Sequence, residues 1–489
     1  MLYYLFNYLD QQDFPGAGVF NYVTFRAAMA IIIALIVSVW FGNWFIKYMK
    51  SKNNTELQRD KSVDPFGESK KGTPGMGGII IITAILVPVL FVCKLHNVYT
   101  LLMIVTTLIL GALGFADDFI KAKAKKEAEK RQKAKEEAER IRLEQLKEEK
   151  KSIEEKIEEL KEEKKSIEEK MGKLMEDKNE EKKEEQKPKD KPGLKPWMKI
   201  SGQILIGLIV GLTLRFSSAV QINEKVQVKI EDNKEVVVKS PDVKSTQTTI
   251  PFVKSHNLNY ADLFKWAGPK WMYNLAWIFL VLVTVFVIAA VSNGANLNDG
   301  MDGMASGNSA IIGLTLLLLA YISSNAVAAG HLNLMYIPGS EELVVYLAAF
   351  VGALIGFLWY NSYKAQIFMG DTGSLTIGGI IAVSAVIMHK ELLLPLLCGV
   401  FLFEIFSDID VEIFKRNGHK HRFWKRAPLH EHFRMSYSDF KKDNPNTKVT
   451  FKGHGEGYDT VHHEVKITIR FWIVTILLAA FTLLTFKIR

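Results

Sequence analysis

Long apolar stretches dominate the pattern of hydrophobic and polar positions along this chain of 489 residues. A membrane-spanning helix needs roughly 20 mostly apolar residues. Ten stretches meet or approach that length, at 23–46, 77–95, 98–116, 198–216, 272–292, 310–328, 343–360, 373–389, 391–412 and 467–487. The ninth is the weakest, because its second half carries Glu404, Asp408 and Asp410. The pattern predicts an all-α polytopic membrane protein with about ten transmembrane helices.

A charged segment, residues 122–192, interrupts the apolar pattern between the third and fourth stretches. It is rich in Lys and Glu, and its residues 148–161 are nearly repeated as 162–175. Lys150 and Lys164 weaken one heptad seam of this predicted helix. Two interpretations remain open, a cytoplasmic dimerisation or partner helix and a solvated single helix held by Glu–Lys pairs. The other seam is apolar at a seven-residue spacing: Leu146, Ile153, Leu160, Ile167 and Leu174.

The chain therefore divides into helices with the first loop (1–121), a charged helical cytoplasmic insert (122–192), and helices with polar loops (193–489). Overall composition, 48% hydrophobic and 24% charged with a net charge of +9, hides this segregation. Lys and Arg concentrate after the first, third and ninth stretches, and such loops stay on the cytoplasmic side. Odd-numbered helices are expected to exit to the cytoplasm, with both termini on the other side. Neither a disulfide framework nor a cysteine metal site is expected from the two cysteines, both in apolar stretches.

The polar, glycine-rich motifs all fall on the predicted cytoplasmic face. A carboxylate at the bilayer centre costs on the order of 3 kcal/mol, so Asp117 and Asp118 after an apolar helix indicate a cation site, proton transfer or emergence into water. Further acids on other loops of this face, Asp299, Asp302 and Asp371, disfavour emergence alone. The motifs are KKGTPGMGG at 70–78, FADDFIK at 115–121, NGANLNDGMDG at 293–303, FMGDTGS at 368–374 and KRAPLHEH at 425–432.

Together these residue types favour metal-assisted phosphoryl transfer at a membrane surface. Carboxylates suit Mg²⁺, which prefers oxygen ligands and bridges substrate phosphates. Lysines and glycine-rich backbone suit a diphosphate, and His430 and His432 can titrate near neutral pH. Asp371 can also cap the helix that follows it. The residue types alone do not identify the substrate.

The motifs, their order and the ten-helix layout resemble the phospho-N-acetylmuramoyl-pentapeptide transferases. The resemblance covers nearly the whole chain except the insert, and GLKPWMKISGQ at 193–203 resumes the pattern. It implies transfer of phospho-N-acetylmuramoyl-pentapeptide from UDP-MurNAc-pentapeptide to undecaprenyl phosphate, which gives lipid I and UMP in peptidoglycan synthesis. It further implies Mg²⁺ as cofactor and a multi-pass homodimer in the bilayer of the bacterial cytoplasmic membrane. The active site would face the cytoplasm, and no nucleic-acid partner is expected.

The resemblance also implies roles for matching residues. Asp117 and Asp118 would form the essential acidic pair, with Asp117 a candidate for deprotonating the lipid phosphate. Asp371 would be the Mg²⁺ ligand, and His430 the essential histidine. The implied substrate-binding residues, of which Lys70 and Phe368 would meet the uracil, are Lys70, Lys121, Lys199, Gln203, Asn296, Asp299, Asp302, Phe368 and His432.

Three departures from the family pattern bear on the site. The family's three consecutive histidines read His430-Glu431-His432, and its NLTDG reads NLNDG. Asp408 and Asp410 stand where the family has apolar residues and then a glutamine, which is expected to alter substrate affinity. The last cytoplasmic loop is also longer and carries histidines that we interpret as solvated: His454, His462 and His463.

Two other functions remain open. A sister polyprenyl-phosphate transferase that uses UDP-N-acetylglucosamine shares the acidic motifs but has a different histidine loop, and PLHEHF at 428–433 is closer to the muramoyl type. The altered histidine loop and the two added acids also leave open a non-catalytic membrane scaffold. A transporter is disfavoured, because it would place ionisable residues near the bilayer midplane in broken helices.

Overall fold

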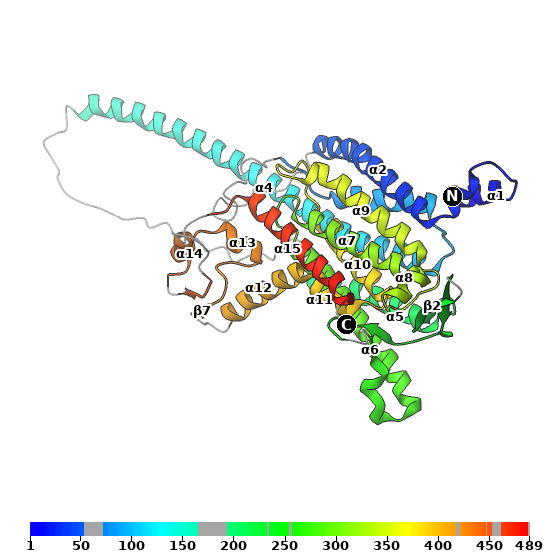
Figure 1. Ribbon diagram of the computed structural model, residues 1–489. Coiled ribbons are helices and arrows are strands. Elements are labelled where there is room, and N and C mark those ends of the chain that lie inside the picture. Colours follow the sequence, from blue (N-terminus) through cyan, green and yellow to red (C-terminus); the bar gives the residue numbers. More distant parts are fainter. Residues whose placement is uncertain are drawn as a thin grey trace. The chain divides into compact units, whose positions relative to one another are not determined.

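The computed structural model describes residues 1–52, 72–164, 193–231, 234–253, 257–416, 421–445, 447–451 and 461–487. The chain forms two units (Figure 1). The first combines Met1–Asp118 with Leu194–Arg489, and the second is Phe119–Gly193.

Helices make up most of the described chain. They are α1 (Leu2–Asp10), η1 (Ala17–Asn21), α2 (Val23–Ser51), α3 (Gly78–Val92), α4 (Val98–Lys164), α5 (Pro196–Phe216), η3 (Tyr260–Ala267), α6 (Pro269–Leu297), α7 (Met304–Ser324), α8 (Ala326–His331), α9 (Glu341–Asn361), α10 (Gly370–Ile387), η4 (Glu391–Leu393), α11 (Leu394–Leu397), α12 (Gly399–Arg416), α13 (Leu429–Arg434), α14 (Tyr437–Asp443), α15 (Glu464–Leu484) and η5 (Thr485–Lys487). The strands are β1 (Ile222–Asn223), β2 (Val226–Glu231), β3 (Lys234–Lys239), β4 (Asp242–Val243), β5 (Gln247–Thr249), β6 (Asn257–Asn259), β7 (His421–Arg422) and β8 (Lys448–Val449).

Among the described residues, eight helices are long and apolar enough to cross a membrane. They lie in α2, the Val98–Arg142 part of α4, α5, α6, α7, α9, α10 and α15. The prediction of an all-α polytopic membrane protein is confirmed. Helix α3 has 15 residues, about 22 Å at 1.5 Å per residue, which is shorter than a hydrocarbon core of about 30 Å. The stretch 391–412 is not one straight helix as predicted. It forms Glu391–Leu397 and Gly399–Arg416, bent by 76°.

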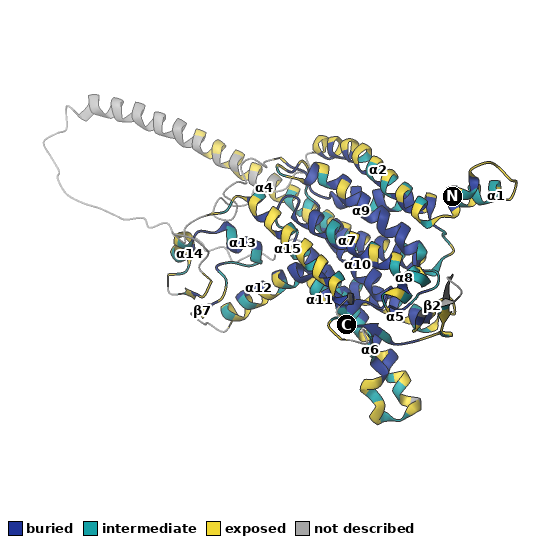
Figure 2. Cartoon of the chain, in the orientation of Figure 1, coloured by how far each residue is buried: buried dark blue, intermediate teal, exposed yellow. Residues whose placement is uncertain are grey.

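Helices α9 and α10 form the centre of the first unit. Helix α9 packs against α2, α3 and α7, and α10 packs against α3, α6 and α7. The buried share of the apolar window is 83% in α9 and 89% in α10, against 22% in α2 (Figure 2). Helices α2, α5, α6 and α15 expose many large apolar side chains. This arrangement places lipid-facing helices around a protein-lined centre.

Short strands occupy the segment between α5 and α6. The antiparallel pairs are β1 with β4, β2 with β3 and β5 with β6. Thr249 of β5 donates its backbone N–H to the carbonyl of His389, at the far end of α10. The Val- and Thr-rich composition of this segment favours such strands, which the sequence analysis did not assign.

In the second unit, the described residues continue α4 as far as Lys164. The helix predicted for the charged insert is therefore present up to that residue. Leu146, Ile153 and Leu160 lie on this helix, whereas Ile167 and Leu174 lie outside the described residues. Whether the seam binds a partner helix stays a prediction.

Candidate active site

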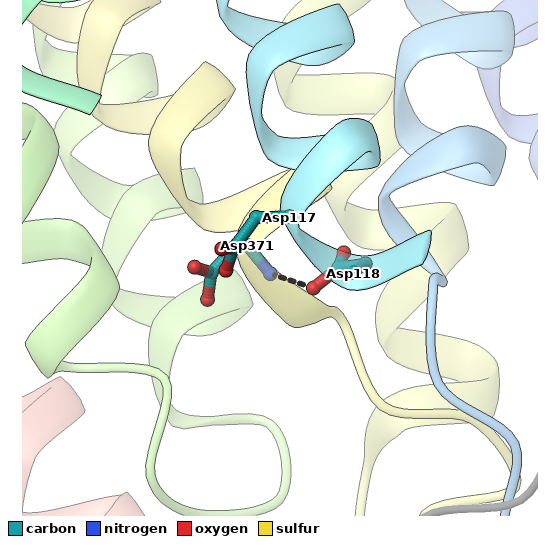
Figure 3. Close-up of side chains that lie close together, drawn as sticks. All are labelled: Asp117, Asp118 and Asp371. Carbon is teal, nitrogen blue, oxygen red and sulfur yellow. Dashed lines mark hydrogen bonds between the residues drawn. The ribbon is translucent and has the colours of Figure 1, made fainter. Parts of the chain in front are cut away.

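Three aspartates meet where α4 passes the start of α10. One carboxylate oxygen from each of Asp117, Asp118 and Asp371 lies within 4.8 Å of the others (Figure 3). The first two are adjacent on α4, and the third is in the first turn of α10. Three carboxylates so close together repel one another unless a cation or hydrogen-bond donors compensate their charge. The cluster is therefore a place where positive charge is needed.

The two adjacent aspartates have different partners because successive helical residues point about 100° apart. Asp117 is fully buried and accepts from the backbone N–H of Leu194 at 2.6 Å. Burial excludes simple emergence into water for Asp117. Asp118 caps α10, accepting from the backbone N–H of Asp371 at 3.1 Å and from the N–H and Oγ1 of Thr372 at 2.9 and 2.6 Å. A carboxylate at a helix N-terminus is stabilised by these donors and by the helix dipole.

Lys199, at the start of α5, joins two of the carboxylates. Its Nζ donates to Oδ2 of Asp117 at 2.8 Å and also to Oδ2 of Asp371. Asn296, at the end of α6, donates its Nδ2 to Oδ1 of Asp371 at 3.0 Å and to the hydroxyl of Ser374 at 2.9 Å. Helices α5 and α6 thus orient the Asp371 carboxylate.

Glycines allow the backbones at this site to approach closely. A Cβ on Gly114 of α4 would lie 2.3 Å from the carbonyl oxygen of Asp371. A Cβ on Gly78 of α3 would lie 2.1 Å from the backbone nitrogen of Gly373. Real Cβ atoms do not approach so closely, so a larger residue at either position would separate α10 from its neighbour. The glycine-rich motifs therefore set the positions of the helix ends that carry the acids.

The loop after α6 holds two further predicted residues that lie outside the aspartate cluster. Asp302 is buried, and its Oδ2 accepts from the backbone N–H of Ala365 at 2.9 Å. Its own N–H donates to Oε1 of Glu464, on α15, at 2.7 Å. Asp299 is partly exposed, and its N–H donates to the carbonyl of Asn296 at 3.2 Å. Asp302 therefore ties this loop to the α9–α10 connection and to α15.

His430 lies in a second group of polar side chains, on α13. It is 2% exposed, and its Nδ1 lies 3.1 Å from Oε1 of Glu404 on α12. A Cβ on Gly300 would lie 2.0 Å from the His430 Nε2, so the ring packs on the loop after α6. Sequence reasoning did not assign Glu404 as this partner, although a buried acid inside an apolar stretch was a usable signal.

His432 is fully buried on the same helix, and its Nδ1 accepts from the backbone N–H of Lys425 at 3.0 Å. The rings of Trp424, Phe433 and Phe451 surround it. Burial, and then the charge of Lys425, lower the pKa of His432 to about 3. His432 is therefore neutral at neutral pH, with its proton on Nε2, and the expectation that it titrates near neutrality is wrong.

Similar proteins align with this chain along their whole length. Residues 189–389 match a family model described as glycosyl transferase family 4. A phospho-N-acetylmuramoyl-pentapeptide-transferase of Bacteroides fragilis is 51% identical over 494 residues, covering 100% of both chains. Proteins of the same name from Phocaeicola vulgatus and Porphyromonas gingivalis are 51% and 42% identical, again over 100% of both chains.

This chain belongs to the phospho-N-acetylmuramoyl-pentapeptide transferase family. It is therefore an enzyme, and specifically a transferase with membrane-spanning helices. The alignments with these relatives cover the whole chain and so also span residues 122–192.

Two further predicted residues of the transferase, Gln203 and Phe368, are buried or partly buried. Gln203 is buried between α5 and α6, where it accepts from Asn293 Nδ2 at 3.1 Å and donates to Ser292 Oγ at 3.3 Å. Phe368 is partly buried, and its backbone pairs with Pro74 and Gly77 of the first motif. These contacts support the helix ends that carry the acids.

Other predicted residues of the transferase are at the surface or undescribed. Lys121 is exposed on α4, one helical turn after Asp117. Asp408 is exposed on α12, and Asp410 accepts from the backbone N–H of Phe423 at 3.2 Å. His463 is exposed and caps α15, and His462 is partly buried. Two predicted positions, Lys70 and His454, lie outside the described residues.

Proposed function

We propose that this transferase moves phospho-N-acetylmuramoyl-pentapeptide from UDP-MurNAc-pentapeptide to undecaprenyl phosphate, which yields lipid I and UMP. The observation that carries the proposal is the cluster of Asp117, Asp118 and Asp371 with Lys199 at the ends of membrane helices. Such a position allows a polar nucleotide from water and a phosphate on a lipid to meet. The names of the full-length relatives support the same donor.

The three carboxylates fit a divalent metal, and we propose Mg²⁺. Their oxygens are hard ligands within 4.8 Å of one another, and the Lys199 ammonium pairs with two of them, which supports a site that favours positive charge. Asp371 would hold the ion with Asp117 beside it, whereas Asp118 caps the start of α10. When bound, Mg²⁺ would supply charge neutralisation for the donor diphosphate.

In the proposed reaction an oxygen of the lipid phosphate attacks the sugar-linked phosphorus. A P–O bond forms there while the bond to the uridylate oxygen breaks, and UMP leaves with that electron pair. A phosphate monoester has a second pKa near 6, so the attacking oxygen is largely ionised at neutral pH, and Asp117 would accept any proton that remains. The work left to the protein is positioning and charge stabilisation. Lys199 would contribute positive charge beside both acids.

The other residues would bind and orient substrate. We assign His430, held by Glu404, to the catalytic set, and Asn296, Asp299, Asp302, Gln203 and Phe368 to the nucleotide side. His432 would support the His430 helix from its buried position. Lys70 would meet the uracil together with Phe368, and Lys121 would bring charge to the diphosphate. The basic loops favour a bacterial cytoplasmic membrane location with this site facing the cytoplasm, and the active form is proposed to be a homodimer.

The experiment is UMP release by the purified full-length protein with undecaprenyl phosphate and Mg²⁺. UDP-MurNAc-pentapeptide and UDP-N-acetylglucosamine are supplied in parallel. Release from the muramoyl donor alone, abolished by EDTA and restored by Mg²⁺, is expected. Release from the smaller donor alone would assign the chain to the sister activity. No release from either donor, with folded protein, would contradict the proposed function.

A further inference from the structure

Glu431 stands where the family pattern has the middle histidine, and it is buried. Its side chain is 6% exposed. Its Oε1 lies 3.0 Å from Nη1 of Arg434 and 3.7 Å from Nε2 of His430. A buried carboxylate is costly unless a cation and hydrogen bonds compensate it. Arg434, one helical turn later on α13, supplies that cation.

The Glu431–Arg434 pair lies inside a longer series of buried contacts. On one side, the His430 ring separates Glu431 from Glu404, which lies 3.1 Å from Nδ1. On the other side, Nη2 of Arg434 lies 3.9 Å from Oε2 of Glu464. Glu464 in turn accepts from the backbone N–H of the loop residue Asp302 at 2.7 Å. The series therefore joins α12, α13, α15 and the loop after α6.

We propose that Glu431 and Arg434 act as one charged unit that positions the His430 ring for the reaction. Glu431 holds the Nε2 side of the ring while Glu404 holds the Nδ1 side. Arg434 neutralises Glu431 and links α13 to Glu464, and hence to the loop on which His430 packs. Glu431 is thus a positioning residue, and the lost imidazole is replaced by a carboxylate together with its arginine. The inference rests on the proposed function for its kinetic consequence.

The short length of α13 makes such a unit necessary. A helix of six residues has few backbone hydrogen bonds of its own and depends on tertiary contacts for its position. Removing one member of a buried ion pair leaves the other charge uncompensated, which is more disruptive than removing both. The two residues should therefore be strongly coupled, and a histidine placed at 431 should be tolerated only when Arg434 is also removed.

The test is a double-mutant cycle in the full-length protein with E431Q, R434Q and E431Q/R434Q, read as kcat and KM for UDP-MurNAc-pentapeptide. Each single variant is expected to lower kcat by about tenfold, the size of coupling typical for residues in direct contact. KM should change less than kcat, and the double variant should lose no more than the weaker single variant. E431H should lose more than E431Q, and E431H/R434Q should recover part of that loss.

The matched control is D439N, which breaks an exposed pair of the same i,i+3 spacing with Lys442 on the adjacent α14, at 3.1 Å. Exposed pairs contribute little, so D439N should retain wild-type kcat. Multiplicative losses in the cycle, or wild-type kcat in both single variants, would overturn the proposal.

A second readout separates this inference from the proposed function. Diethyl pyrocarbonate modification of His430, measured by mass spectrometry, should be slow in wild type, where the ring is 2% exposed. It should be several times faster in E431Q and R434Q and unchanged in D439N, with His432 as the internal reference. If wild type releases no UMP, the proposed function fails while this result still decides the positioning. Unchanged labelling in both variants would overturn it.

Discussion

Different interactions position the aspartate cluster and the histidine group of this transferase. Asp117, Asp118 and Asp371 lie on long membrane helices whose backbones pack closely through glycine. His430 lies on a helix of six residues, positioned by buried side chains of neighbouring helices. The first region is fixed by backbone packing, and the second by charged contacts. Charge removal at Asp117 and Asp371 should therefore affect chemistry, whereas charge removal around His430 should affect the geometry of its ring.

The largest expected effect is at Asp371. Asp371→Asn keeps the side-chain size but removes the charge that we assign to the metal, so kcat should fall by about 10³-fold or more. Asp117→Asn should leave a higher residual rate, because the lipid phosphate is already largely ionised at neutral pH. UMP release under saturating Mg²⁺ measures both. Equal and complete loss in the two variants would contradict the assigned roles.

The next effect is at Glu404, the partner of His430. Glu404→Gln keeps a hydrogen-bonding group near Nδ1 but removes the charge, and kcat should fall by about 10²-fold, a contribution typical of a positioned acid–base group. Glu412→Gln, on the exposed side of the same helix, is the matched control and should behave as wild type. Full activity of Glu404→Gln would remove His430 from the catalytic set.

A smaller effect, on stability, is expected at Asp118. Asp118→Asn weakens three hydrogen bonds to the start of α10 and should reduce the free energy of unfolding by about 1–2 kcal/mol. Thr372→Val removes only the hydroxyl donor and should cost less. Thermal unfolding in detergent compares the two. A melting temperature of Asp118→Asn equal to wild type would show that the carboxylate does not act as the cap.

The smallest effect concerns His432 and pH. Its pKa is lowered to about 3 in the folded protein, against about 6.5 when unfolded. Between these values the unfolded chain binds more protons, so the stability from neutral His432 is complete above about pH 6.5 and is lost as pH falls through this window. Between about pH 6.5 and 4.5, His432 alone lowers the free energy of unfolding by at most about 1.4 kcal/mol for each pH unit. His432→Gln should therefore make the free energy of unfolding depend less on pH over this range.

Thermal unfolding across that pH range provides the measurement. The control His331→Gln, on an exposed histidine of α8, should keep the wild-type slope. A slope in His432→Gln as steep as in wild type would show that other groups cause the pH dependence.

Sequence patterns were sufficient to predict the structural elements that depend only on local composition. Apolar stretches located the membrane helices, because a span needs about 20 apolar residues wherever it lies in the fold. The motifs also located the three acids that meet. The 76° bend before Gly399 was not predicted, because the apolar pattern continues through it. Pro395 and Gly399 were the available signals.

Contacts between distant residues could not be read from the sequence. Lys199 joins Asp117 and Asp371. The three residues come from three different helices, and no local sequence pattern specifies that bridge. The contact between Glu431 and Arg434 could be expected from the sequence, because a spacing of three residues places both side chains on one face of a helix. Their burial and their links to Glu404 and Glu464 depend on tertiary packing alone.

The most direct test of the central claim is metal binding at the aspartates, measured by electron paramagnetic resonance during Mn²⁺ titration of wild type, Asp371→Asn and Glu404→Gln. Mn²⁺ accepts the same oxygen ligands as Mg²⁺. We expect one Mg²⁺-displaceable Mn²⁺ in wild type and Glu404→Gln, with binding lost or at least about tenfold weaker in Asp371→Asn. Wild-type binding by Asp371→Asn would contradict the assignment of this cluster as the metal centre.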